Sequence, residues 1–176
     1  MKRFFTLVLG TVAAAMFVSC TDNSKQNVSQ EVNDGPAVKG TYELTLVVSK
    51  DAVDQKDVIK TVVTAGGKEY EFTSDMEKFT LKPETEFAIP HEETIVVTQT
   101  LKDGVSLTKD NYLLGLVYSL SVSSLNAKGG SAYTDKIEKD MYSSIKKEKL
   151  GGNFKNVYTF SFAINAAGEI TTLKRD

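Results

Sequence analysis

From about residue 40 onward, apolar and polar side chains alternate with a period of two over most of the chain. In the segment 41–48, Tyr42, Leu44 and Leu46 share one face, and threonine and glutamate residues occupy the other. Successive side chains of a β-strand point to opposite faces, so this alternation is typical of strands that bury one face. The sequence therefore predicts an all-β fold.

Glycine-containing segments separate the alternating runs at 65–68, 103–104 and 165–168. Glycine readily adopts the positive φ angles of tight hairpin turns, so the segment 65–68 predicts a hairpin and the other two segments predict turns. Seven or so short strands without a βαβ rhythm favour an antiparallel immunoglobulin-like β-sandwich. The alternative is a lipocalin-like up-and-down barrel, because Gly40-Thr41-Tyr42 bears a likeness to the first strand of that family.

The longest alternating run, 112–125, exceeds the usual strand length of about 5–6 residues. Its one internal glycine, Gly115, is the expected place for a bend or bulge. The segment that follows differs, because Ile137, Met141 and Ile145 are spaced four residues apart. This spacing predicts one short helix near 134–149 that stops at Gly151-Gly152. An edge hairpin is the alternative.

The chain begins with Lys2 and Arg3, followed by an apolar stretch over 4–18 and then by Ser19 and Cys20. This layout is that of a secretory signal, and the apolar stretch is shorter than a membrane-spanning helix of about 20 residues. The small residue before the only cysteine resembles the signal peptidase II lipobox of bacterial lipoproteins. The resemblance implies that 1–19 is a signal peptide and that Cys20 carries a lipid. An ordinary secretory signal that leaves a free thiol is the alternative.

The segment 20–37 behind Cys20 is rich in asparagine, glutamine and serine, so it is expected to be a flexible tether. A single β-sandwich domain would then occupy 38–176. The expected location is the bacterial cell envelope, lipid-anchored at the outer membrane, with the membrane as one partner. Removal of 1–19 leaves 19 basic and 23 acidic residues, a net charge of −4. Nucleic acid is therefore not expected as a partner.

Residues capable of catalysis or metal binding are few. The only histidine, His91, lies in a polar segment and is expected to be exposed and inert. One histidine and one lipidated cysteine do not make a zinc site. The acids Asp51, Asp54 and Asp57 do not match the spacing of a calcium-binding EF-hand loop. They are expected to lie in a solvated acidic loop. No catalytic residue, metal or cofactor is expected.

These observations favour a non-catalytic cell-envelope lipoprotein that displays its sandwich to a protein or glycan partner. Tyr133 and Tyr142 are candidates for stacking on a sugar. The alternative is a lipocalin-like carrier of a small apolar ligand, which would require the barrel. Hydrolysis by a carboxylate pair, drawn from Glu84, Glu86, Glu92 and Glu93, is a third hypothesis, and it requires two acids facing each other across a cleft.

Overall fold

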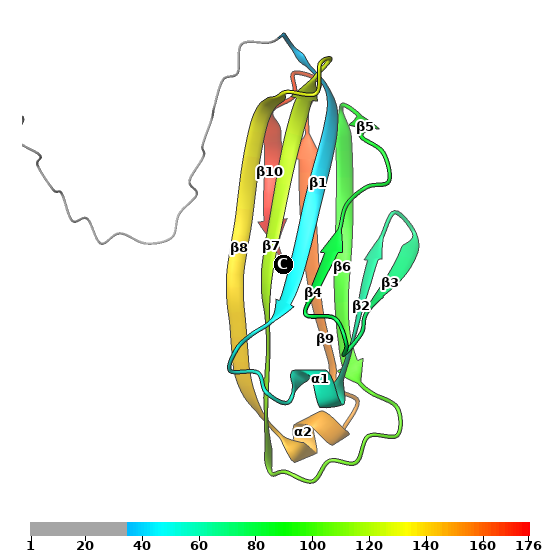
Figure 1. The fold of residues 1–176 in the computed structure, drawn as a ribbon, viewed down its shortest axis with the longest axis vertical. Coiled ribbons are helices and arrows are strands. Elements are labelled where there is room, and N and C mark those ends of the chain that lie inside the picture. The colour runs from blue at the N-terminus through cyan, green and yellow to red at the C-terminus, as the bar shows by residue number, and fades with distance from the viewer. Residues whose placement is uncertain (1–34) are drawn as a thin grey trace, which may run out of the picture.

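The structure, a computed structural model, describes residues 35–176, so the predicted signal peptide, Cys20 and most of the predicted tether lie outside the described residues. Two antiparallel sheets of five strands pack face to face (Figure 1). Neither sheet closes on itself within this range. The predicted all-β sandwich is therefore confirmed at this level, and the barrel alternative is wrong. Within residues 35–176, no helix has the length and apolar character needed to cross a membrane.

The first sheet has the order β4-β1-β7-β8, with β5 paired to the start of β1. Its strands are β1 (Ala37–Val48), β4 (Lys78–Leu81), β5 (Phe87–Ala88), β7 (Asn111–Asn126) and β8 (Ser131–Lys146). The second sheet has the order β10-β9-β6-β2-β3. Its strands are β2 (Ile59–Ala65), β3 (Lys68–Phe72), β6 (His91–Leu101), β9 (Lys155–Ile164) and β10 (Ile170–Arg175). Two short helices, α1 (Gln55–Val58) and α2 (Lys147–Gly151), lie at the end of the sandwich opposite the start of β1.

The core forms where the alternating apolar faces of the two sheets meet. On β1, Tyr42, Leu44 and Leu46 are buried, as the alternation predicts; β7 of the same sheet and β6 and β9 of the facing sheet contribute the other core side chains. Tyr118 of β7 meets Phe160 of β9 edge to face, with ring centroids 4.9 Å apart. Each such buried apolar side chain contributes about 1.5–3 kcal/mol relative to an exposed one. These contacts fix the separation of the two sheets.

All three predicted turns are present, and two of them join paired strands. Gly104 lies in a turn with a φ angle of +72°, but the strands on either side of it, β6 and β7, belong to different sheets. Gly66 and Gly67 join β2 to β3 with φ angles of +55° and +74°. At the turn between β9 and β10, the Asn165 side-chain oxygen accepts the backbone N–H groups of Ala167 and Glu169, each at 2.9 Å. The turn residues therefore set the hairpins as the sequence predicts.

The predicted helix near 134–149 is wrong, because Ser131–Lys146 is the strand β8, paired with β7 over almost its full length. A spacing of four residues aligns side chains on a helix, but it also aligns them on a strand, whose period is two. Ile137, Met141 and Ile145 thus share the inward face of β8, where they are half-buried. The edge-hairpin alternative is confirmed, and the remaining helix, α2, ends at Gly151.

Gly115 does not carry the bulge that the sequence predicts. Pairing between β7 and β8 runs without interruption through Gly115, and the register shifts at Ser124 and Leu125 instead. A Cβ atom on Gly115 would lie 2.2 Å from the backbone oxygen of Met141. The glycine is therefore needed for the close approach of β7 and β8.

Candidate functional site

β10 is shorter than β8 and β9 (Figure 1). A cleft lies between the two sheets beyond the last described residue of β10. The outer edge of β9 is the side away from β6. On this edge the last backbone pair is Thr159 with Asp176, which are joined by two hydrogen bonds of 2.8 and 3.0 Å. Beyond this pair, β9 continues over 155–158 and β8 continues to Lys146. The space between them is the β8–β9 cleft, of about 380 Å³, which lies in the range of about 300–1,000 Å³ usual for ligand pockets. Its 13 lining residues come from β6, β7, β8, β9, β10 and the α2–β9 loop.

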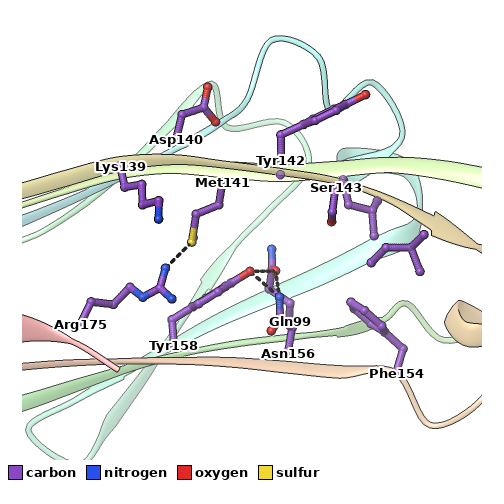
Figure 2. Close-up of a pocket in the computed structure, with 13 residues that line it drawn as sticks. Gln99, Lys139, Asp140, Met141, Tyr142, Ser143, Phe154, Asn156, Tyr158 and Arg175 are labelled. Atoms are coloured by element: carbon purple, nitrogen blue, oxygen red, sulfur yellow. Dashed lines mark hydrogen bonds between the residues drawn. The ribbon is translucent and has the colours of Figure 1, made fainter. Parts of the chain in front are cut away.

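One end of the β8–β9 cleft is cationic. Arg175, the last residue of β10, extends toward β8, and Lys139 extends from β8 toward it (Figure 2). The guanidinium donates to the sulfur of Met141 at 2.8 Å and lies 5.3 Å from the ring centre of Tyr158. A thioether is a weak acceptor, so this contact compensates little of the hydration that the guanidinium loses.

The middle of the cleft holds a polar cluster of Gln99, Asn156 and Tyr158. The Tyr158 hydroxyl donates to the side-chain oxygen of Gln99 at 3.3 Å, and the Asn156 amide donates to the Tyr158 oxygen. Burial raises the pKa of Tyr158, although Arg175 and the hydrogen bond from Asn156 act in the opposite direction. Tyr158 therefore stays neutral at physiological pH and acts as a hydrogen-bonding group.

The other end is apolar. Leu114 of β7, Ile145 of β8 and Phe154, which precedes β9, line it. Figure 2 shows Phe154 on the side of the cleft away from Arg175. A ligand lying along the cleft would thus meet positive charge at one end and apolar surface at the other. This arrangement suits binding, because the lining side chains supply hydrogen-bond donors and apolar contacts.

Asp54, predicted to lie in a solvated loop, is buried with 5% of its surface exposed. It accepts the backbone N–H of Leu113 at 2.8 Å and forms an ion pair with Lys109. Burial tends to raise the pKa of Asp54, but the Leu113 N–H and the Lys109 ammonium outweigh it and hold the pKa below its ordinary value. The prediction of a solvated loop is therefore wrong for Asp54, which ties the loop before α1 to β7. Asp51 and Asp57 are exposed.

Of the remaining predicted residues, Tyr142 is among those that line the β8–β9 cleft, whereas His91, Tyr133 and the four candidate glutamates are not. His91 begins β6 and stacks on Phe87 with ring centroids 3.9 Å apart, so it is half-buried, contrary to the prediction of an exposed side chain. Its Nε2 lies 3.6 Å from a carboxylate oxygen of Glu93. Glu84 pairs with Lys68 and Glu86 with Lys39. Within residues 35–176, no three or more His, Cys, Asp or Glu side chains come together in a group that could hold a metal ion.

The cleft residues Gln99, Lys139 and Arg175 are absent from the sequence-based candidates. A signal for Gln99 exists, because it follows Ile95 and Val97 at the inward positions of β6, where a polar side chain requires partners. A similar signal exists for Lys139, because it lies between the apolar residues Ile137 and Met141 on one face of β8. No comparable signal marks Arg175. Comparisons of the chain with protein-family models, curated proteins and solved structures find no significant match.

Proposed function

We propose that this chain is a non-catalytic lipoprotein of the bacterial cell envelope, held at the outer membrane by a lipid on Cys20. Residues 20–37 form the tether, and the domain is an immunoglobulin-like sandwich that binds an extended segment of a protein partner. The binding place is the β8–β9 cleft together with the free outer edge of β9. The anchor is supported by the two cations, the apolar stretch and the single cysteine of the N-terminal residues.

The observation that carries the binding proposal is the stretch of the outer edge of β9 that no strand of residues 35–176 covers. Peptide groups of an antiparallel strand face alternate sides, and the Thr159 N–H and C=O face outward, toward Asp176. The groups of Val157 and Lys155 therefore also face outward, and no strand of the described chain pairs with them. A partner strand laid in line with β10 would form these hydrogen bonds, and its inward side chains would enter the cleft.

A protein partner fits the geometry better than a glycan. Tyr133 and Tyr142 have opposite parity on β8, so their rings leave opposite faces of the strand. They are also nine residues apart, which corresponds to about 30 Å along a strand. The two rings therefore do not form one stacking platform for a sugar.

The anchor is tested by metabolic labelling with a fatty-acid probe. Cys20→Ala removes the only thiol, so it should abolish labelling, whereas the tether variant Ser24→Ala should label like the native chain. Labelling that persists in Cys20→Ala would contradict the anchor.

The binding edge is tested by co-purification from the native envelope. Val157→Pro removes the outward N–H without breaking a hydrogen bond to β6, so the domain should fold and the partner should be lost. Val157→Ala keeps the N–H and is the matched control, which should retain the partner. Equal recovery of the same partner with both variants would rule out binding by strand addition.

A further inference from the structure

The cationic end of the β8–β9 cleft carries charge that no carboxylate of residues 35–176 neutralises. Within residues 35–176, neither Arg175 nor Lys139 forms an ion pair with a carboxylate. Asp140, the neighbour of Lys139, points to the other face of β8 and accepts a hydrogen bond from Ser49 at 3.2 Å. Arg175 is instead placed over the rings of Tyr118 and Tyr158, at 5.8 and 5.3 Å.

A buried donor in the cleft also lacks an acceptor. Gln99 is 5% exposed, and its side-chain oxygen accepts from Tyr158 and Asn156 at 3.3 and 3.4 Å. Its side-chain nitrogen has no hydrogen-bond partner within the described chain. Buried polar groups are nearly always paired, so an unpaired amide in a cleft that also holds Arg175 and Lys139 points to an acceptor supplied from outside.

We propose that the β8–β9 cleft binds a carboxylate group joined to an apolar group. The carboxylate lies between Lys139 and Arg175, within reach of the donor-rich middle of the cleft, and the apolar part packs against Ile145, Leu114 and Phe154. Arginine suits this task because its planar guanidinium binds both oxygens of a carboxylate. The inference deepens the proposed function and rests on it for the source of the carboxylate, which is an acidic side chain of the partner segment.

The chemistry is tested on the purified domain with octanoate, which presents only a carboxylate and an alkyl chain. Titration followed by ¹H–¹⁵N NMR should give saturable shifts at the Gly115 amide and at the side-chain amide of Gln99. The uncharged 1-octanol and the cationic octylammonium should shift these signals much less. Equal shifts with octanoate and 1-octanol, or no saturable shift with octanoate, would overturn the proposal.

Substitutions in the cleft separate the contribution of charge to octanoate binding from the contribution of packing. Arg175→Met and Lys139→Met keep the length of the side chain, so each should weaken octanoate binding by about tenfold, as loss of one charge-assisted contact predicts. Arg175→Lys keeps the charge and should recover part of the affinity. Lys146→Met is the matched control, because Lys146 lies on the same strand but does not line the cleft. Unchanged affinity in both methionine variants would overturn the carboxylate site.

A competition experiment identifies the source of the carboxylate. Excess octanoate should displace the co-purified partner from the native protein, while 1-octanol should not. A partner that depends on the Val157 edge but resists octanoate would refute this inference and leave the proposed function standing. Octanoate binding together with a partner insensitive to Val157→Pro would refute strand addition and leave the carboxylate site standing.

Discussion

At the scale of single residues, Asp54 is buried, whereas its sequence context predicts a side chain in a solvated loop. Asp54→Ala would leave the half-buried Leu113 N–H without its acceptor and Lys109 without its ion pair. We expect the free energy of unfolding at pH 7 to fall by about 1–3 kcal/mol, the usual cost of an unsatisfied buried donor. Urea denaturation measures this change. The matched control is Asp51→Ala in the same loop, where exposure predicts a change within about 0.5 kcal/mol.

The same residue predicts a pH dependence. The pKa of Asp54 is lower in the folded chain than in the unfolded one, so the charged carboxylate stabilises the fold fully above about pH 4. This contribution is lost as the pH falls through the folded-state pKa. The stability difference between the native chain and Asp54→Ala should therefore shrink in acid. A difference that stays constant from pH 7 to pH 2 would contradict this account.

Sequence patterns predict inward and outward faces well at this scale, but they do not predict which polar side chains meet. The alternation correctly assigns Tyr42, Leu44 and Leu46 to the core, because burial of one strand face is a local property. The contact between Asp54 and Leu113 joins residues 59 positions apart, and the pattern holds no record of such pairs. The pattern gives no signal for Arg175 for the same reason, because the tertiary fold alone places it beside Met141.

At the scale of elements, the close pairing of β7 and β8 depends on Gly115. Gly115→Ala would place a methyl group 2.2 Å from the Met141 backbone oxygen, and backbone gives way less easily than a flexible side chain. We expect a loss of about 1–3 kcal/mol in the free energy of unfolding, as for other overpacked sites. Gly151→Ala is the control, because its nearest contact, a Leu107 side-chain carbon at 3.5 Å, is an ordinary one. Thermal unfolding of the two variants distinguishes them, and equal melting temperatures would contradict the close approach.

Element type can be predicted from the sequence wherever only one period fits the apolar pattern. The run at 112–125 alternates over most of its length and is correctly predicted as a strand, β7. The spacing at Ile137, Met141 and Ile145 fits both a helix and a strand, so the local pattern alone does not decide which of the two forms. The long pairing with β7 decides the outcome, because an unpaired helix would leave the β7 edge without its hydrogen-bond partners.

At the scale of the whole molecule, unequal strand lengths create the β8–β9 cleft. The alternation predicts strands in each sheet, but it does not predict that β10 stops opposite Thr159 while β8 continues. Such an offset depends on how the two sheets are stacked, and each sheet includes paired strands that are distant in the chain, such as β1 with β7 and β6 with β9. The cleft could therefore be located only from the assembled fold.

This offset predicts a sharp step in amide protection along β9. The Thr159 N–H donates to the Asp176 carbonyl at 3.0 Å, whereas the outward N–H of Val157 has no strand beside it. Hydrogen exchange followed by NMR should therefore show Val157 exchanging far faster than Thr159, because unpaired edge amides open at little cost in free energy. Deletion of Asp176 should bring the exchange rate of Thr159 close to that of Val157. Slow exchange at Val157 in the isolated monomeric domain would mean that the edge is already covered, and strand addition at β9 would then be excluded.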